Sequence, residues 1–240
     1  MRSIRNPGRV AGFWYLLLVL LGPLRLIYIP DKLFVRGNAA VTANNIAAHE
    51  WLFRLGIMSD LVGGVILIFL VLAFYRLFKT VDRNLAVMVV IFGGVMPALL
   101  DFVGAAFDAA TLMIAHGSDF LSAFDKPQQE ALAMLFVKLG DEQTNAAEML
   151  WGIWLLPLAL LVYRSRFLPR FLGVWLAVNG FAYVILCLTS ELLPQYQNDV
   201  FTYGQPAFLG EVAIMLWLVI KGARPPADAA DSLSAVGARP

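Results

Sequence analysis

Six apolar runs, each close to the length of a membrane-spanning helix, dominate the chain. Crossing a bilayer as a helix takes about 20 residues. Only 15% of the residues are charged, whereas soluble domains carry about 25%. The sequence therefore predicts an all-α fold, a polytopic membrane helix bundle whose six transmembrane helices lie in the lipid bilayer. Hydropathy places them at roughly 10–29, 55–75, 85–110, 146–163, 171–191 and 205–220.

Two segments outside the spans have helix caps and an apolar face. The segment 42–56, "TANNIAAHEWLFRLG", predicts a helix capped by Thr42 or Asn44. The segment 125–140, "DKPQQEALAMLFVKLG", predicts a helix capped by Asp125. We expect two outer amphipathic helices, over 43–54 and 127–140, on the membrane surface. The alternative is that each one extends the following span beyond the lipid.

The C-terminal end differs in composition from the rest of the chain. Residues 222–240, "GARPPADAADSLSAVGARP", are small, polar and proline-containing. Such a composition does not bury a core, so it predicts a disordered cytoplasmic tail. The expected organisation is one transmembrane domain at 1–221 followed by this tail.

The sequence contains none of the catalytic motifs that we searched for, and it lacks the strong positive charge that is typical of nucleic-acid-binding proteins. The net charge of +1 gives no basic field for nucleic acid. His49 and Glu50 begin like a zincin motif, but Phe53 stands where the second histidine is required. No nucleophile elbow and no P-loop is found. We assign no catalytic and no metal-ligating residue, leave the cofactor unknown, and regard enzymatic activity as uncertain but disfavoured.

Ionisable residues inside the spans fall at similar depths. A helix rises 1.5 Å per residue, so Arg25, Asp60 and Glu148 lie roughly 24 Å from the basic residue at the inner end of their own span. Asp101 lies roughly 27 Å from its inner end, and Glu211 only roughly 15 Å. The first four thus share a layer in the outer part of a hydrocarbon core about 30 Å thick.

The acid-bearing face of span three is lined by small residues. Gly94, Ala98, Asp101, Ala105 and Asp108 recur at spacings of four and three, which places them on one helix stripe. Small residues let helices approach closely. We therefore expect the acids to point into the bundle rather than at lipid.

A second set of polar residues is expected at the outer rim of this layer. Asp108 lies two helical turns, roughly 10 Å, beyond Asp101. The rim set also contains the two histidines, which are otherwise interpreted as ordinary interfacial residues. Its members are His49, Arg54, Asp108 and His116.

Ionisable residues within spans mark ion, proton or substrate pathways by default. The leading hypothesis is a binding or transport module with an outward-facing acidic cavity for a cation, proton or small ligand. Arg25, Asp60, Asp101 and Glu148 would line it, with Glu211 below. One acid is expected to be ionised against Arg25 and another to hold a proton.

Two alternatives stay open. One is a structural or sensory subunit whose acids pair with a partner protein, and the other is a lipid-acting membrane enzyme. The sequence identifies neither a protein partner nor an oligomeric state.

Two stretches resemble a known family. They are "NIAAHEWLFRLGI" at 45–57 and "WGIWLLPLALLVYRSRFLPRFLGVWLAVNGFAYV" at 151–184. Both are similar to the bacterial membrane proteins of domain-of-unknown-function family 4386, and the resemblance covers most of residues 8–220. It implies a multi-pass α-helical protein of the bacterial cytoplasmic (inner) membrane, and it implies no activity.

Basic residues are divided unequally between the two sides of the predicted bundle. The side with both termini holds twelve: Arg2, Arg5, Arg9, Arg76, Lys79, Arg83, Arg164, Arg166, Arg170, Lys221, Arg224 and Arg239. The opposite side holds six: Arg25, Lys32, Arg36, Arg54, Lys126 and Lys138. Because short cytoplasmic loops carry the excess of lysine and arginine, both termini are expected in the cytoplasm.

This orientation is tested by reporter fusions at the C-terminus. A reporter that is active only in the cytoplasm should give signal there, because an even number of spans returns the chain to its starting side. Silence of that reporter, together with signal from one that is active only outside the cytoplasm, would reverse the assigned orientation.

Overall fold

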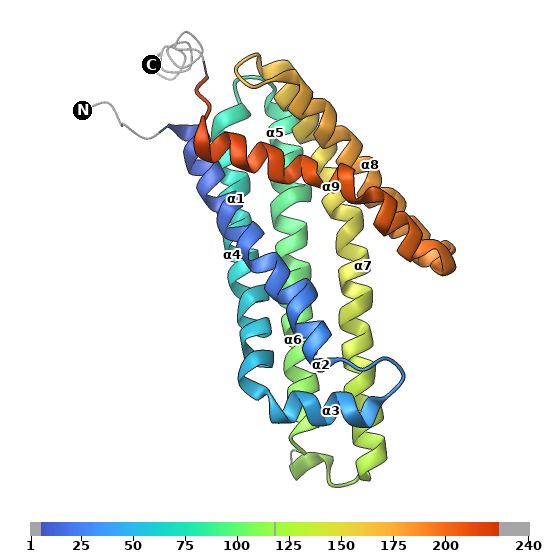
Figure 1. Ribbon diagram of the computed structural model, residues 1–240. Coiled ribbons are helices and arrows are strands. Elements are labelled where there is room, and N and C mark those ends of the chain that lie inside the picture. Colours follow the sequence, from blue (N-terminus) through green and yellow to red (C-terminus); the bar gives the residue numbers. More distant parts are fainter. Residues whose placement is uncertain (1–5, 118, 226–240) are drawn as a thin grey trace, which may run out of the picture. The chain divides into compact units, whose positions relative to one another are not determined.

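Helices are the only regular elements in the computed structural model, which describes residues 6–117 and 119–225. Figure 1 shows them coloured along the chain. In order they are α1 (Pro7–Pro23), η1 (Leu24–Tyr28), α2 (Ile29–Leu33), α3 (Ala39–Ala48), α4 (Glu50–Phe78), α5 (Arg83–Val90), η2 (Ile91–Val95), α6 (Met96–Ala115), η3 (Asp119–Leu121), α7 (Lys126–Ser165), α8 (Arg170–Leu192), η4 (Pro194–Tyr196) and α9 (Gln197–Ile220).

Six helical stretches within the described residues are long and apolar enough to cross a membrane. Each contains one of the six predicted spans, so the predicted all-α, multi-pass membrane fold is confirmed. The stretches are Pro7–Leu33, Glu50–Phe78, Arg83–Ala115, Lys126–Ser165, Arg170–Leu192 and Pro194–Ile220.

The cap predicted for α7 is confirmed, and the caps predicted for α3 are wrong. The backbone N–H of Gln128 donates to Asp125 at 2.9 Å, and the Gln128 side chain accepts from the Asp125 N–H at 3.0 Å. This reciprocal pair is a capping box. In α3 the cap is Asn38, which accepts from the backbone of Val41. Thr42 instead lies inside the helix and bonds to Val35.

Both predicted outer segments are helical. The segment 43–54 is interrupted at His49, where α3 ends and α4 begins at Glu50. The segment 127–140 continues without a break into the fourth span, within the 40 residues of α7. For this segment the alternative interpretation applies: it is the first part of the helix that forms the fourth span, and not a separate helix.

Two π-helical turns occur directly before prolines. In η1 the N–H of Ile29 bonds to the carbonyl of Leu24, and Pro30 follows; in η2 the N–H of Met96 bonds to Ile91, and Pro97 follows. Proline has no N–H and its ring clashes with the carbonyl four residues earlier. A wider turn before the proline relieves that clash, and such single π turns often occur at functional sites.

Close contacts divide the chain into two compact units. Unit 1 comprises Met1–Leu17, Ile66–Pro97 and Glu148–Pro240, and unit 2 comprises Leu18–Val65 and Ala98–Ala147. The expectation of one domain over 1–221 stays a prediction. Within the predicted tail, residues 222–225 are not helical. Its remaining part, 226–240, lies outside the described residues.

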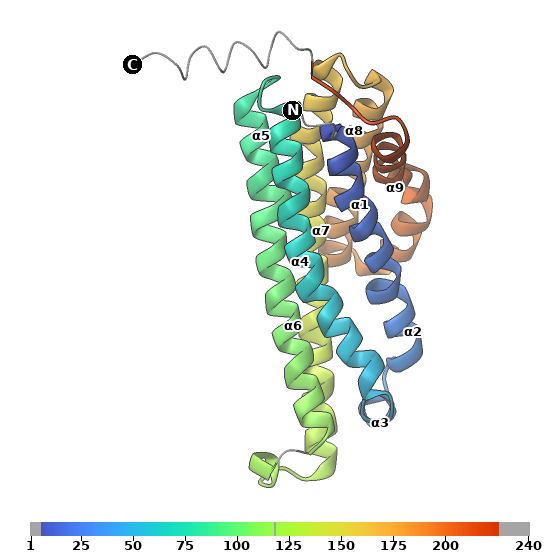
Figure 2. The same cartoon turned by 90° about the vertical axis from the view of Figure 1, so that its left-hand side faces the viewer.

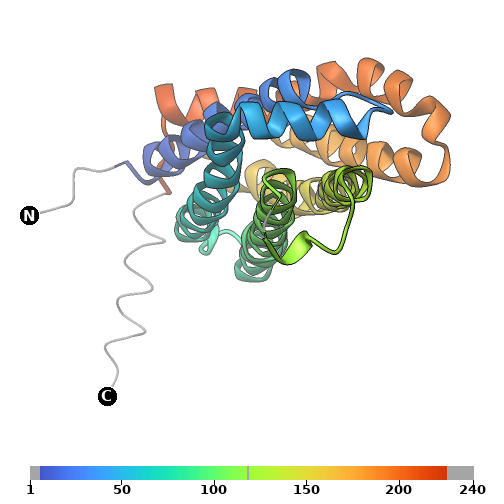
Figure 3. The ribbon, with the colours of Figure 1, turned by 90° about the horizontal axis from the view of Figure 1, so that it is seen from below.

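In unit 2, α3 runs crosswise to the start of α4, and α6 lies beside the first half of α7 (Figures 2 and 3). The rings of Phe107 and Phe136 meet between α6 and α7 with centroids 6.3 Å apart. The main buried cluster of this unit joins α2, α3, α4, α6 and α7. It consists of Ile29, Leu33, Ile46, Phe53, Leu112 and Val137.

In unit 1, α8 and α9 pack together as consecutive helices of opposite direction (Figure 1). The helices α7 and α8 approach most closely at two glycines. A Cβ added to Gly152 would stand 2.6 Å from the carbonyl oxygen of Gly180, and one added to Gly180 would stand 2.8 Å from that of Gly152. Only glycine permits this contact, because the neighbouring atoms are backbone and do not move aside easily.

We expect Gly152→Ala to lower the free energy of unfolding by about 1–3 kcal/mol, the usual cost of overpacking. Gly63→Ala on α4 is the matched control, because a Cβ there meets nothing within 4 Å. The control should leave stability unchanged or raise it by up to about 1 kcal/mol through helix propensity. Thermal unfolding of both purified variants in one detergent measures the difference. Equal melting temperatures would contradict the close crossing.

Candidate functional site

In unit 2 one arginine, Arg25, bonds to two aspartates, Asp60 and Asp108; we call these three side chains the arginine fork. Arg25 donates from Nε to both carboxylate oxygens of Asp60, at 2.8 Å each. Its Nη2 donates to Oδ2 of Asp108, also at 2.8 Å. The three side chains are only 16%, 13% and 5% exposed, respectively. Charge-assisted bonds of this kind are the strong ones in proteins, and burial strengthens them further.

Local backbone features bring these three side chains together. Arg25 lies in the π turn η1, Asp60 is on α4 and Asp108 is on α6. A Cβ on Gly56 of α4 would stand 3.0 Å from Ile29 and 3.9 Å from the aliphatic part of the Arg25 side chain. The glycine therefore leaves room for η1 and the start of α2 to approach α4. The π turn and Gly56 thus position the guanidinium.

Asp101 stands next to this fork without joining it. It interacts electrostatically with Asp60 and with Arg25, yet it has no hydrogen bond to any residue that the structure describes. Its side chain is partly exposed, unlike that of Asp108. Three carboxyl groups therefore share one guanidinium, which leaves two surplus negative charges if all three are ionised.

The neighbouring wall of the site comes from α7. A Cβ on Gly104 would stand 2.5 Å from the side-chain oxygen of Gln143 and 3.9 Å from Oδ2 of Asp60. Gly140, one turn before Gln143, lies beside Oδ1 of Asp108 at 4.0 Å by the same measure. The glycines let a polar α7 face approach the acids. Sequence reasoning missed Gln143, although its spacing of three from Gly140 places the two on one helix face.

The structure redistributes the predicted layer. Arg25, Asp60 and Asp101 come together in unit 2, whereas Glu148 and Glu211 belong to unit 1. Asp108, which the sequence assigns to the outer rim, is 3% exposed and bonded to Arg25, so it belongs to the same group of side chains as Asp60. Arg25 bonds to Asp60 of α4 and to Asp108 of α6, but not to Asp101, which lies two turns before Asp108 on α6.

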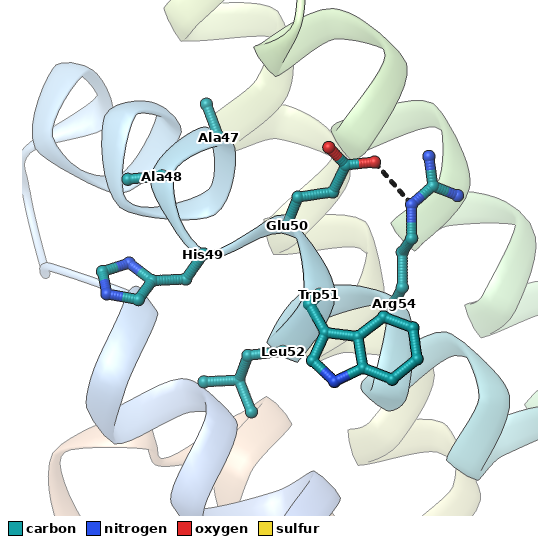
Figure 4. Close-up of a pocket in the computed structure, with 7 residues that line it drawn as sticks. All are labelled: Ala47, Ala48, His49, Glu50, Trp51, Leu52 and Arg54. Atoms are coloured by element: carbon teal, nitrogen blue, oxygen red, sulfur yellow. Dashed lines mark hydrogen bonds and ion pairs between the residues drawn. The ribbon is translucent and has the colours of Figure 1, made fainter.

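The remaining rim residues surround the start of α4. Glu50 accepts from Arg54 at 2.6 Å and lies 2.9 Å from Nε2 of His116. In Figure 4 the side chains of Glu50 and Arg54 point toward each other, while the His49 ring points away from them. His49 bonds instead to the backbone of Asn45. A surface hollow lies here, lined by Ala47, Ala48, His49, Glu50, Trp51, Leu52 and Arg54.

Within the described ranges, no three His, Cys, Asp or Glu side chains are arranged to hold a metal ion. In the fork, both oxygens of Asp60 and one of Asp108 already accept from Arg25. The free acceptors of the site are therefore few, and they belong to Asp101 and to the second oxygen of Asp108. Such a set is better matched to a proton or to water than to a multi-ligand cation.

Arg25→Ala is expected to lower stability by about 3–5 kcal/mol, because it leaves two buried carboxylates without a partner. The double variant Arg25→Ala/Asp108→Asn should lose less, since one of the orphaned charges is gone. Arg54→Ala is the control: its ion pair is 56% and 39% exposed, so no measurable change is expected. Chemical or thermal unfolding in detergent gives the comparison. An Arg25→Ala protein as stable as the wild type would contradict the fork.

Comparison with known proteins identifies the family. The family described as "Domain of unknown function (DUF4386)" matches residues 10–222. A relative described as an uncharacterized protein of Archaeoglobus fulgidus is 27% identical over 150 residues, which cover 62% of this chain and 73% of the relative. No solved structure matches the chain. Because the family match extends over most of the sequence, this multi-pass membrane protein belongs to the DUF4386 family.

Proposed function

We propose that the protein is a transport module that moves protons across the membrane, with Asp101 as the group that takes up and releases them. The single observation that supports this best is the arrangement of three buried or half-buried carboxyl groups around one arginine. Arg25 compensates Asp60 and Asp108 through direct bonds. Asp101 receives no such bond, and so it is the group whose charge is least compensated.

The hydrocarbon of the membrane disfavours the ionised form of Asp101. A charged side chain costs about 2.5–3.5 kcal/mol at the middle of a span on insertion scales, and less toward the outer part of the core where Asp101 is expected. A proton on Asp101 removes this cost and also removes its repulsion from Asp60. When the proton leaves, Arg25 is close enough to stabilise the anion electrostatically. Both the protonated and the ionised form of Asp101 are therefore stabilised, as a proton carrier requires.

Partial exposure supports exchange at this position. Asp101 is half-buried, whereas Asp108 is buried. A half-buried carboxyl group exchanges protons with water more readily than a buried one, provided that its exposed side faces a hydrated gap between helices. The polar side chain of Gln143 lies next to Asp60 and can hold such water at the α7 wall. A purely structural subunit needs neither the exposed acid nor the polar wall.

The test is proton flux into vesicles that contain the purified protein and a trapped pH-sensitive dye. A potassium diffusion potential drives the flux, and wild-type protein should acidify the lumen faster than protein-free vesicles do. Asp101→Asn should abolish this difference, because Asn retains the shape but does not titrate. Glu142→Gln, which alters an exposed acid on α7, is the matched control and should keep the wild-type rate.

Two results would contradict the proposal. One is a wild-type rate equal to that of empty vesicles, and the other is an Asp101→Asn protein that folds and conducts like the wild type. Either would favour the structural-subunit alternative, in which Asp101 serves only in packing or pairing.

A further inference from the structure

Unit 1 contains a second polar cluster, formed by buried and half-buried side chains, and it differs from the arginine fork in having no basic member. Its centre is Glu211 on α9, which accepts a hydrogen bond from the hydroxyl of Tyr15 on α1. Tyr15 is only 1% exposed. Two side chains of α8, Tyr183 and Asn179, face the same carboxyl. Two helices, α1 and α8, thus direct polar groups at one acid of α9.

Tyr183 joins this cluster to a second acid. Its ring packs against Phe208 of α9, with centroids 4.7 Å apart, and against Trp151 of α7, at 5.8 Å. Tyr183 interacts electrostatically with Glu211 on one side and with Glu148 of α7 on the other. The phenol is therefore within electrostatic range of two carboxyl groups, and of these only Glu211 is within hydrogen-bonding reach. Gly152 and Gly180 make this possible, since they bring α7 and α8 into backbone contact.

Two acceptor atoms in the cluster are buried without a donor. They are Oε2 of Glu148 and Oδ1 of Asn179, and neither has a hydrogen-bond partner among the described residues. Asn179 is completely buried. Its amide nitrogen donates to the carbonyl of Phe208 at 3.4 Å, which fixes the orientation of the amide, because a carbonyl oxygen accepts only from the nitrogen. A buried acceptor without a donor is costly and indicates that something is bound there.

The two buried acceptors require hydrogen-bond donors, and the acids require positive charge or protons. Within the part of the chain that the structure describes, no lysine or arginine contacts Glu148 or Glu211. A carboxylate in this environment without a basic partner is strongly disfavoured. A proton on the carboxyl group solves the charge problem, and an ordered water supplies the donors that Glu148 and Asn179 lack.

We propose that Glu148, Glu211, Tyr15, Tyr183 and Asn179 form a proton-storing site with an ordered water, separate from the arginine fork of unit 2. Tyr183 relays protons between the two acids. When Glu211 is the ionised member, Tyr183 gives its hydroxyl proton to Glu211 and receives a proton from the ordered water, which in turn takes the proton of Glu148. Glu148 then carries the negative charge, Tyr183 is neutral as before, and no other reactant is needed.

A route to the surface follows the same face of α8. Asn179, Tyr183, Cys187 and Glu191 recur every four residues, so they lie on one stripe. Glu191 is exposed, whereas Cys187 is buried and interacts electrostatically with both Glu148 and Glu191. From Asn179 to Glu191 the helix rises about 18 Å. The titratable groups on the facing elements are Tyr15 (α1), Glu148 (α7), Tyr183, Cys187 and Glu191 (α8), and Glu211 (α9).

Infrared spectroscopy of the reconstituted full-length protein at neutral pH tests this site. Protonated carboxyl groups give a carbonyl band that is separate from the bands of carboxylates and shifts in deuterium oxide. The wild type should show this band. Glu148→Gln and Glu211→Gln should each lose part of it, while Glu142→Gln, an exposed acid on the same helix α7, should lose none.

Further variants keep the test informative if a glutamine variant does not fold. Tyr15→Phe removes the bond to Glu211 and should shift its part of the band without changing that of Glu148. Tyr183→Phe should leave both parts in place and slow deuterium exchange at Glu211 but not at Glu148. Exchange that is equally fast at both acids in this variant would overturn the relay.

Two outcomes would overturn the storage site. One is the absence of any band that Glu148→Gln or Glu211→Gln diminishes. The other is the disappearance of that band when sodium, potassium or calcium is added to a buffer free of them, because this would identify a metal cation in place of the proton. Asp101→Asn is measured in parallel: a band lost only in that variant belongs to unit 2, so failure here is distinguishable from failure of the proposed function.

Discussion

The cost of placing charge in hydrocarbon determines how the polar residues of this protein are arranged. Arg25 meets this cost in unit 2 by bonding simultaneously to Asp60 and Asp108. The π turn before Pro30 positions the guanidinium, and Gly56 leaves room for its stem. Asp101 acquires its special status from this fork, since it is the acid next to Arg25 that the arginine does not bond.

The two units reduce the cost of carboxylate charge in an apolar environment in different ways. Unit 2 combines three acids with one arginine, which bonds directly to two of them. Unit 1 combines two acids with tyrosines and an asparagine, and its described residues offer no basic partner. In the first arrangement the arginine stabilises two of the three acids, and a proton on Asp101 lowers the remaining charge. In the second arrangement no basic partner stabilises the acids, so their charge has to be removed by protons. Both arrangements are suited to proton chemistry, although each stands on separate observations.

The sequence predicted the membrane fold, because length and hydropathy are properties of single helices. The sequence also predicted that Asp101 and Asp108 lie on the same helix face as small residues, because the number of residues per helical turn is constant. It did not predict which acid Arg25 would bond. The depth of each residue was measured along an ideal straight helix, but η1 is widened, and an arginine side chain spans more than one turn. Asp108 was therefore placed at the rim although it is the buried partner of Arg25. Tyr15, Tyr183 and Asn179 were missed because neutral polar residues give no charge signal, although the spacing of four between Asn179 and Tyr183 marks a polar stripe on α8.

Solid-state NMR of the protein in bilayers, with carbon-13 in the aspartate carboxyl groups, measures the charge state of the arginine fork directly. Protonated and ionised carboxyl carbons resonate at different shifts, and Asp101→Asn assigns the signal of that residue by its loss. At neutral pH, Asp60 and Asp108 should be ionised, and Asp101 should show a protonated population that exchanges with solvent. An Asp101 signal that is wholly ionised and unaffected by pH would contradict the view that this acid is the proton-carrying group beside Arg25.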